Sequence, residues 1–274
     1  MDMKEAFIQA CLELFDQCLG NRITVPDLGE LTIYDTPLIG FASATDDLFM
    51  RYKEPEVIGN MFWTPTEWLP EAQTVVSFFF PFSEAVRSSN RNDPEVPSTQ
   101  WLYARIEGQQ FIDGFMDRLG RQLSEQGIRV CIPSLDERKG MQMEPADSAN
   151  GQDFHVNNRW SERHAAYACG LGTFGLSRGL ITERGMAGRF ASILLDASYT
   201  PEPRTYSGVY DNCIRCGACA RNCPAGAISL EHGKNNVLCS RYLDQFKEQF
   251  APRYGCGKCQ VGVPCECRSP VHGK

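Results

Sequence analysis

The spacing of apolar residues along the chain predicts three main helices. Residues 2–19 and 100–126 repeat apolar side chains at steps of three and four, which gathers them on one helix face. Residues 160–169 are rich in alanine and contain no β-branched residue, a composition that favours a helix. Gly20 and Gly127 follow the first two segments, and glycine commonly ends a helix. Each helix should therefore bury one face against a core.

Shorter apolar runs predict the strands. Residues 74–80, Thr-Val-Val-Ser-Phe-Phe-Phe, are β-branched or aromatic almost throughout, as in a strand that is buried on both faces. Residues 128–132 and 189–196 have a similar composition, and residues 31–43 predict one or two strands interrupted by a proline. Residues 87–98 are polar and contain two prolines, so we expect a loop there.

The alternation of helices and strands predicts a mixed α/β (α+β) body as the fold class. Residues 198–206 contain two prolines and few large apolar side chains, and we expect them to form a linker. The predicted domains are therefore the body at residues 1–200 and a cysteine-rich module at residues 205–274.

Two features predict a cytoplasmic protein without a membrane partner. The longest apolar runs are much shorter than the roughly 20 residues of a membrane-spanning helix. The chain also begins Met-Asp-Met-Lys-Glu, without the basic segment and apolar core of an export signal.

Charge is distributed unevenly along the chain. Its 274 residues include 27 Lys and Arg against 34 Asp and Glu, a net charge of −7. From Thr205 onward, nine basic residues accompany five acidic ones, so this tail carries +4 and the body −11. An acidic body does not favour nonspecific binding of nucleic acid. The positive tail would offset the negative charge of metal clusters held by thiolates.

The chain has 13 cysteines, and nine of them lie between Cys213 and Cys267. Cytosolic thiols stay reduced, so a metal explains this crowding better than disulfides do. Cys11 and Cys18 lie on the apolar face of the first predicted helix, and Cys131 lies in a predicted strand. We expect these three to pack in the core as small hydrophobic side chains.

The strongest signal in the sequence is the run Cys213-x2-Cys216-x2-Cys219-x3-Cys223-Pro224. In bacterial ferredoxins, the first three thiolates of such a run bind one cluster, and the fourth binds a second cluster. The two-residue gaps let one tight loop reach three corners of a cubane. The spacing therefore predicts two 4Fe–4S clusters, which need eight cysteines in total.

Five later cysteines are candidates for the four remaining ligands: Cys239, Cys256, Cys259, Cys265 and Cys267. Cys256 and Cys259 form a second loop pair, and either Cys265 or Cys267 would cross back to the first cluster. Structural zinc is the main alternative, but three cysteines within seven residues followed by Cys-Pro fit zinc poorly. A radical-SAM cluster needs a three-residue gap followed by a two-residue gap, and Gly226 stands where that pattern requires a cysteine.

Two short motifs resemble cofactor sites without their full context. Residues 170–175, Gly-Leu-Gly-Thr-Phe-Gly, match a dinucleotide-binding fingerprint, which requires a strand before it and a helix after it. Here a predicted helix precedes the glycines. We expect them to cap that helix and to lie against a large flat ligand, with a purely structural turn as the alternative. Asp153-Phe154-His155 begins like a corrinoid motif, but Asn158 replaces its glycine, so we do not expect His155 to bind cobalt.

Residues 155–267 resemble epoxyqueuosine reductase and are also similar to the catalytic subunit of reductive dehalogenases. The resemblance is carried by Ser161-Glu162-Arg163, by the glycine run and by the four-cysteine run with its Cys-Pro. It implies a nitroreductase-like core that holds a base-off cobalamin, and a fused two-cluster ferredoxin-like module that supplies the electrons. It also implies corrinoid contacts from seven residues: Gly170, Gly172, Phe174, Gly175, Arg178, Leu180 and Thr182.

The same resemblance assigns the cluster ligands by position. One cluster would be bound by Cys213, Cys216, Cys219 and a returning cysteine, and the other by Cys223, Cys239, Cys256 and Cys259. The returning ligand departs from the family pattern, because Val263 stands where the family has Cys-Pro. Cys265 follows two residues later, and we favour it over Cys267.

A second departure concerns the substrate. Epoxyqueuosine reductases carry an aspartate, their proton donor, shortly before the Glu-Arg pair, and here Val156, Asn157 and Asn158 occupy that neighbourhood. The chain is also shorter than the usual member, and we expect no C-terminal helical-repeat extension of the kind that helps to recognise transfer RNA. A transfer RNA substrate is left open, but a diverged branch with another substrate is the expectation.

Four residues near the glycine run are acid–base candidates: His155, Glu162, His164 and Tyr167. On a helix, Glu162 and Arg163 commonly form a solvated or paired face, and His164 has the character of a packed histidine. A proton donor must lie within hydrogen-bond reach of the substrate. The sequence does not identify which residue meets that condition.

The sequence therefore predicts an oxygen-sensitive oxidoreductase. A low-potential donor of the ferredoxin or flavodoxin type would reduce the clusters. The clusters would reduce a cobalamin in the body for reductive cleavage or deoxygenation of a small-molecule substrate. Two alternatives remain: an electron-transfer protein that reduces the corrinoid of a partner protein, and a reductase that uses flavin instead of cobalamin.

Overall fold

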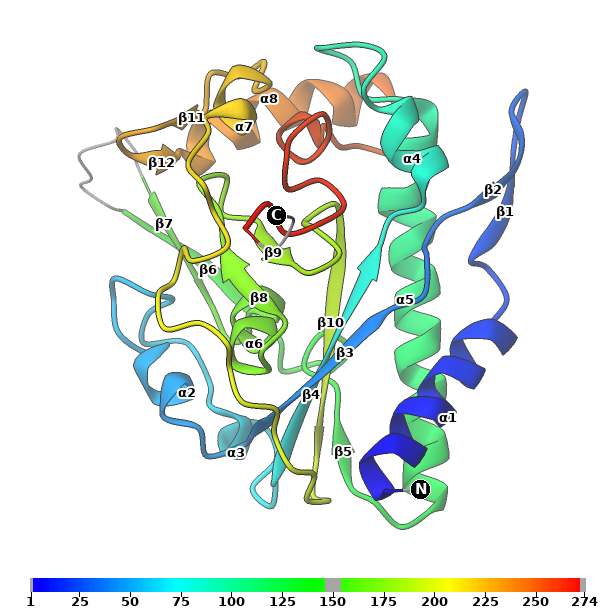
Figure 1. Cartoon of the computed structure of the whole chain (residues 1–274), viewed down its shortest axis with the longest axis vertical. Helices are drawn as coiled ribbons and strands as arrows, with labels where there is room; N and C mark the ends of the chain where they lie inside the picture. The colour runs from blue at the N-terminus through cyan, green and yellow to red at the C-terminus, as the bar shows by residue number, and fades with distance from the viewer. Residues whose placement is uncertain (1, 146–153, 272–274) are drawn as a thin grey trace.

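The computed structural model describes residues 2–145 and 154–271 and, of residues 143–145 and 154–156, the backbone only. Its centre is an antiparallel four-stranded sheet in the order β3-β4-β10-β5 (Figure 1). The strands are β3 (Leu38–Ser43), β4 (Thr74–Pro81), β10 (Gly188–Leu195) and β5 (Val130–Cys131). All four confirm predicted strands, although β5 is shorter than expected.

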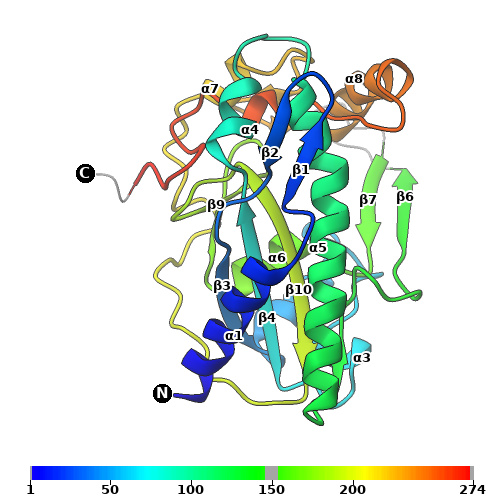
Figure 2. The same ribbon diagram turned by 90° about the vertical axis from the view of Figure 1, so that its right-hand side faces the viewer.

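Helices cover both faces of this sheet (Figures 1 and 2). One face carries the two long helices, α1 (Met3–Gln17) and α5 (Thr99–Glu125). The opposite face carries α2 (Asp47–Arg51), α3 (Pro65–Trp68) and α6 (Glu162–Ala168). The bounds of α1, α5 and α6 confirm the three predicted helices, and the mixed fold class is as expected.

The uninterrupted apolar run of β4 is explained by its central place in the sheet. Successive side chains of a strand point to opposite faces. Accordingly, Val76, Phe78 and Phe80 pack in the core under α1 and α5, whereas Val75 packs in the core under α6. Both faces of β4 are covered, so its sequence lacks the polar residues that alternate with apolar ones in a strand with one face in water.

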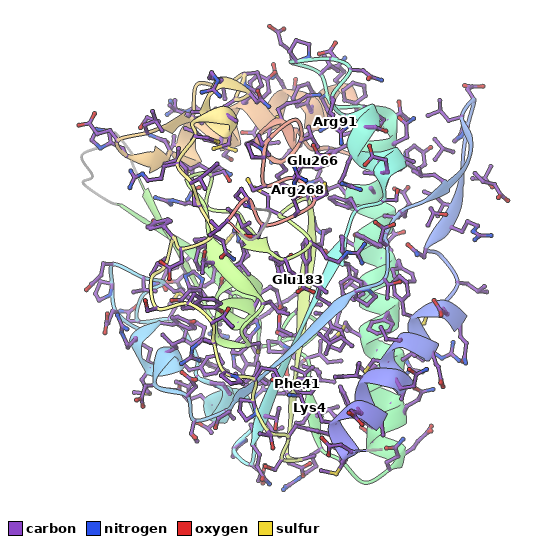
Figure 3. All side chains as sticks on the ribbon, viewed as in Figure 1. Lys4, Phe41, Arg91, Glu183, Glu266 and Arg268 are labelled. Carbon is purple, nitrogen blue, oxygen red and sulfur yellow. The ribbon has the colours of Figure 1, made fainter. Side chains whose placement is uncertain are left out.

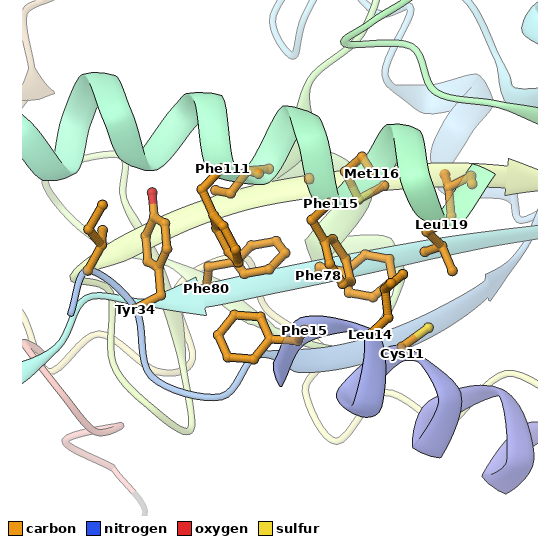
Figure 4. Close-up of a cluster of buried hydrophobic side chains, with 14 of the residues drawn as sticks. Cys11, Leu14, Phe15, Tyr34, Phe78, Phe80, Phe111, Phe115, Met116 and Leu119 are labelled. Carbon is orange, nitrogen blue, oxygen red and sulfur yellow. The ribbon is translucent and has the colours of Figure 1, made fainter. Parts of the chain in front are cut away.

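Aromatic rings fill the space between the sheet and the two long helices (Figure 4). Phe115 of α5 meets Phe78 and Phe80 edge-on at ring-centroid distances of 5.7 and 5.6 Å. Phe15 of α1 meets Phe111 of α5 in the same manner at 5.6 Å. Edge-to-face pairs of this kind add to the stabilisation that comes from burial alone, so they fix α1 and α5 relative to the sheet.

The cysteines outside the tail pack largely as predicted. Cys11 and Cys131 are buried, and burial raises the pKa of their thiols to about 12 and about 11. Cys18 is only half-buried, at the margin of the same core as Cys11. Cys169 is buried too, and its thiol donates a hydrogen bond to the Val75 carbonyl at 3.3 Å. These thiols are parts of the core.

Several smaller elements surround this framework. They are β1 (Arg22–Val25), β2 (Gly29–Thr32), α4 (Glu84–Ser89), β6 (Met141–Pro145), β7 (Phe154–Asn158), β8 (Gly172–Phe174) and β9 (Leu180–Thr182). The loop predicted for residues 87–98 was wrong at its start, because α4 extends into it. Ser83 caps α4 by accepting a hydrogen bond from the Val86 amide, and such a cap stabilises a short helix in a polar sequence.

The cysteine-rich tail packs across one end of the sheet, beside α4 (Figure 1). It contains α7 (Ala218–Arg221), β11 (Ile228–Ser229), β12 (Gly233–Lys234), α8 (Asn236–Gln249) and a 3-10 helix (Lys258–Gln260). Asn90 donates a hydrogen bond to the Cys256 carbonyl at 2.9 Å, and Lys258 donates one to the Asn90 carbonyl at 2.9 Å. Arg91 and Glu266 form an ion pair across the same junction (Figure 3).

The stretch predicted as a linker, residues 198–206, contains neither helix nor strand. None of the described helices combines the length and apolar character needed to cross a membrane.

Candidate functional site

Four cysteines line one cavity in the tail. Cys213, Cys216 and Cys219 come from the predicted cluster loop, and Cys265 reaches the same cavity from the C-terminal segment. The cavity encloses about 360 Å³, part of it open to solvent. The loop turns sharply at Gly217, whose φ of +72° suits a residue without a Cβ. This is the set predicted for the first cluster.

The two candidates for the returning ligand lie in different places. Cys265 lines the cavity, and its Sγ lies 3.3 Å from the sulfur of Met186. Cys267 is exposed and is not among the residues that line the cavity. This placement favours Cys265. Within residues 2–145 and 154–271, no three His, Cys, Asp or Glu side chains converge tightly enough for a single metal ion.

A second set of cysteines gathers beside the first. Burial is the main cause that raises the pKa of Cys256, and the nearby charges of Cys259 and Cys239 raise it further. Burial likewise raises the pKa of Cys259, with Cys239 and Cys223 adding to the effect. The Cys223 sulfur accepts a hydrogen bond from the Ala227 amide at 3.3 Å. Cys223, Cys239, Cys256 and Cys259 thus lie within electrostatic range of one another.

The chemistry of both sets suits iron–sulfur clusters. Burial, and then the charges of neighbouring cysteines, raises the pKa of Cys219 to about 11 and that of Cys265 to about 12. Iron binds thiolates and stabilises them against protonation. A small apolar core that includes Leu176 and Ile228 packs against five of the eight cysteines: Cys213, Cys219, Cys223, Cys259 and Cys265. Cys219 and Cys259, one from each set, lie within electrostatic range of each other.

The glycine run forms the turn between α6 and the β8–β9 hairpin. Gly170 has a φ of +79°, and the Leu171 amide donates to the Ala166 carbonyl at 3.0 Å, so the run caps α6 as predicted. Gly172 lies opposite Thr182 in the hairpin. A Cβ at Gly172 would lie 2.1 Å from the Ile181 carbonyl oxygen. Close strand pairing therefore accounts for this glycine without a ligand.

The other residues predicted to contact a corrinoid differ in accessibility. Leu180 and Thr182 are buried, and the Thr182 hydroxyl donates to the Gly185 carbonyl at 2.8 Å. Gly175 is buried as well, with Ile181 beside it. Phe174 is half-buried and Arg178 is exposed. The surface that a ligand can reach in this hairpin therefore centres on Phe174 and Arg178.

Glu162 is held in a short hydrogen-bonded chain. Its Oε2 accepts a hydrogen bond from the Ser192 hydroxyl at 2.6 Å, and the Ser192 oxygen accepts one from the Trp160 indole at 2.9 Å. The buried Oε1 atom has no hydrogen-bond partner among the described residues. Burial raises the pKa of this carboxyl to about 8. Glu162 is therefore mainly protonated at pH 7, which the expectation of a solvated or ion-paired residue had missed.

The remaining acid–base candidates have structural contacts. His164 shares a hydrogen bond of 2.8 Å with the Ser161 hydroxyl, and burial, followed by the charge of Arg163, lowers its pKa to about 3. The ring of Tyr167 packs against Phe174. The side chain of His155 lies outside the described part of the chain. His164 is thus a neutral, packed histidine, as expected.

Sequence reasoning missed a group of four arginines that come from separate elements. We call Arg105 of α5, Arg163 of α6, Arg178 of the β8–β9 turn and Arg189 of β10 the arginine cluster. Arg163 donates to the Arg178 carbonyl at 3.1 Å, and Arg189 donates to Gln109 at 2.9 Å. Arg105 lies over the ring of Tyr254 at 4.5 Å from its centroid. The sequence had singled out two of the four, Arg163 in the Glu-Arg pair and Arg178 among the implied corrinoid contacts, but not their proximity to Arg105 and Arg189.

Members of the arginine cluster differ in accessibility: Arg163 and Arg178 are exposed, whereas Arg105 and Arg189 are half-buried. Burial, and then the charges of Arg178 and Arg189, lowers the pKa of Arg163, so this guanidinium lies deep in the protein. Its side chain nevertheless retains exposed surface. We infer that Arg163, which is accessible although protein surrounds it closely, faces an interior space, which we call the cleft. Cys259 of the second cysteine set also acts on Arg163, so this space lies next to the predicted second cluster.

Comparison with known proteins gives matches to the cysteine-rich tail and to the fold of the whole chain. The 4Fe–4S binding domain family, Fer4, matches residues 208–229, which include the cluster loop. Among solved structures, epoxyqueuosine reductase from Bacillus subtilis, with its catalytic loop swung out of the active site, superposes with a TM-score of 0.54 at 18% identity. That match covers 98% of this chain and 67% of the other. This chain has the epoxyqueuosine reductase fold.

Two further structures extend the comparison. Epoxyqueuosine reductase from Streptococcus thermophilus matches with a TM-score of 0.53 at 15% identity, over 97% of this chain and 66% of that one. The catabolic reductive dehalogenase NpRdhA matches with a TM-score of 0.51 at 16% identity, over 98% of this chain but 37% of the other. The chain thus spans 65–68% of the length of the matched epoxyqueuosine reductases. No curated protein sequence matches it.

Proposed function

We propose that the chain is an iron–sulfur oxidoreductase that passes electrons through two 4Fe–4S clusters to a corrinoid cofactor in the α/β core. The reaction would be a reductive cleavage or deoxygenation of a small-molecule substrate. The observation that carries this proposal is the division of eight cysteines into two adjoining sets, one of which borders the internal cleft.

The order of the two sets supports a direction for electron flow. Cys216 of the first set is exposed, so an external low-potential donor of the ferredoxin or flavodoxin type can approach it. Cys219 of the first set lies within electrostatic range of Cys259 of the second set, and Cys259 in turn acts on Arg163 at the cleft. The clusters would therefore carry electrons from the outer surface to the cleft, one at a time.

The core offers specific residues for a second cofactor. Phe174 and Arg178 of the β8–β9 hairpin have accessible surface toward a flat ligand, and the half-buried Phe190 of β10 adds a second aromatic surface. A corrinoid would supply a metal centre that accepts electrons and reduces the substrate, while the protein positions it. Glu162 would hold a proton beside the cleft at neutral pH.

Anaerobic purification tests the electron-transfer part of the proposal. We expect about eight iron and eight sulfide per chain, and an electron paramagnetic resonance spectrum of two reduced clusters after dithionite treatment. Metal-free protein, zinc alone or a single cluster would refute the proposal.

Titration with cobalamin under the same conditions tests the second cofactor. Binding should change the visible spectrum of the cobalt, and dithionite-reduced protein should then reduce it. An unchanged spectrum together with co-purified flavin would assign the core to a flavin. Corrinoid recovered only with a partner protein would make the chain an electron-transfer protein for that partner.

A further inference from the structure

The arginine cluster carries positive charge that no ion pair with a described residue neutralises. None of its four members forms an ion pair with a described Asp or Glu; Arg163 donates to a carbonyl and Arg189 to an amide oxygen. The Nε atom of Arg105 is buried and has no hydrogen-bond partner within the described residues. Of the described carboxyl groups, Asp113 acts on Arg189, while Glu162 is mainly protonated.

Positive charges held close together in this way are unfavourable. Arg105 and Arg189 are half-buried and lose part of their hydration, and a neighbouring guanidinium adds repulsion to each member of the cluster, including the exposed Arg163 and Arg178. Arg178 and Arg189 both act on Arg163, and Arg105 acts on Arg189, so the repulsion runs through the whole cluster. The fold nevertheless brings these side chains together from four elements that lie far apart in the sequence. A negative charge from outside the chain would offset the repulsion.

We propose that the arginine cluster binds the anionic group of a small ligand, a phosphate ester or a carboxylate. The planar donor fork of arginine matches both groups, because it can form two parallel hydrogen bonds to their oxygens. Gln109 and Tyr254 hold two of the arginines in place from the sides. The inference builds on the proposed function, since it names the substrate class for the cleft next to the second cluster.

The cluster thiolates neutralise only part of this charge. Cys259 acts on Arg163, whereas the groups that act most strongly on Arg189 are Tyr34, Arg105, Tyr254 and Asp113, none of which is a cluster cysteine. Arg189 therefore remains available to an anion after the iron–sulfur clusters have formed. For this reason the test uses the full chain with its clusters reconstituted.

The direct test is calorimetric titration of the reconstituted protein with inorganic pyrophosphate. We expect Arg163→Gln and Arg189→Gln to weaken binding at least tenfold, and Arg163→Lys to restore part of it. Arg121→Gln is the matched control, because Arg121 is an exposed arginine on α5 with a surface partner, Asp117. Equal affinity in all four variants and the parent protein would overturn the proposal.

Thermal unfolding provides a second measurement that does not require tight binding. In a buffer free of multivalent anions, Arg189→Gln should raise the melting temperature, since it removes an unbalanced charge. Saturating pyrophosphate should stabilise the parent protein more than the variant. A variant that melts lower in the anion-free buffer and responds fully to pyrophosphate would show that Arg189 is structurally paired, and would contradict the proposal.

The anion could be part of the substrate or of the cofactor, and a pair of corrinoids separates these sources. Hydroxocobalamin carries a phosphodiester, whereas cobinamide lacks it. If loss of the phosphodiester weakens binding to the parent protein but not to Arg163→Gln, the cofactor supplies the anion. If Arg163→Gln weakens the binding of both corrinoids equally, or of neither, while pyrophosphate binding still depends on Arg163, the substrate supplies the anion.

These results are independent of the redox proposal. Iron and sulfide contents near two clusters, combined with arginine-independent pyrophosphate binding, would reject the anion site and leave the electron-transfer function standing. Pyrophosphate binding that depends on the arginines, in a protein that assembles no clusters, would support the anion site and reject the electron-transfer function.

Discussion

Ser192 donates a 2.6 Å hydrogen bond to Oε2 of Glu162 and so joins the first turn of α6 to the central strand β10. The serine also accepts a hydrogen bond from Trp160. The carboxyl group of Glu162 is therefore fixed in position, with a buried Oε1 atom, and the residue is next in sequence to Arg163. This relationship places a protonated carboxyl beside the arginine cluster.

Glu162→Gln should change how the stability of the protein depends on pH. Burial raises the pKa of Glu162 from the usual range near 4.5 to about 8, so between these pH values the folded state holds a proton that the unfolded state has released. The free energy of unfolding of the parent protein should therefore fall as pH rises from about 4.5 to 8, by a few kcal/mol in order of magnitude.

The glutamine variant lacks this titration, so its stability curve should be flatter over the same window. Denaturant unfolding at pH 5, 6, 7 and 8 measures the difference. Parallel curves for the two proteins would mean that Glu162 titrates near its usual pKa and does not hold a proton at pH 7.

Cys265→Ser and Cys267→Ser should differ in iron content. Cys265 lines the cavity with Cys213, Cys216 and Cys219, whereas Cys267 is exposed outside it. We expect Cys265→Ser to lose or destabilise one cluster, leaving about four iron per chain, and Cys267→Ser to keep about eight. Iron analysis and electron paramagnetic resonance under anaerobic conditions measure this; the opposite pattern would transfer the ligand to Cys267.

Gly172→Ala should destabilise the β8–β9 hairpin. The added Cβ would lie 2.1 Å from the Ile181 carbonyl, and backbone on a paired strand cannot move aside cheaply. We expect a loss of about 2 kcal/mol or more in the free energy of unfolding. Gly114→Ala is the control, because this exposed glycine of α5 has open space around its Cβ, and alanine there should add about 0.5–1 kcal/mol. Similar effects of both substitutions would mean that the hairpin pairs less closely than described.

Glu266→Gln should loosen the contact between the tail and the core. The Glu266 side chain is 6% exposed, forms an ion pair with Arg91 and accepts a hydrogen bond from the Gly262 amide. Removing its charge leaves Arg87 and Arg91 without a counter-charge on that side. Arg91 is partly exposed, so we expect a loss of about 2 kcal/mol rather than the full cost of a buried unpaired charge.

Limited proteolysis and denaturant unfolding check this expectation. Asp244→Asn serves as the control, since the Asp244–Lys247 pair is exposed within α8 and should contribute about 0.5 kcal/mol or less. Equal effects at the two sites would indicate that the tail is held mainly by other contacts.

Local sequence patterns were sufficient for the main elements. The apolar spacing predicted α1 and α5, and the unbroken run at 74–80 predicted β4, because periodic burial is written directly into neighbouring residues. The same approach missed α4, whose short polar sequence relies on the Ser83 cap and on packing against α5. It also assigned Glu162 to a solvated face, because burial by β10 and Trp160 cannot be read from the helix alone.

By itself, the sequence determined the iron–sulfur character of the tail, because the ligands of one cluster are set by gaps of two and three residues within a single loop. The sequence favoured Cys265 over Cys267 by resemblance, and the tertiary structure places Cys265 at the first cavity. The tertiary structure alone brings Arg105, Arg163, Arg178 and Arg189 within electrostatic range of one another. Those side chains come from segments separated by up to 84 positions in the sequence. Their mutual repulsion, and hence the expectation of an anionic ligand, exists only after α5, α6, the hairpin and β10 have packed together.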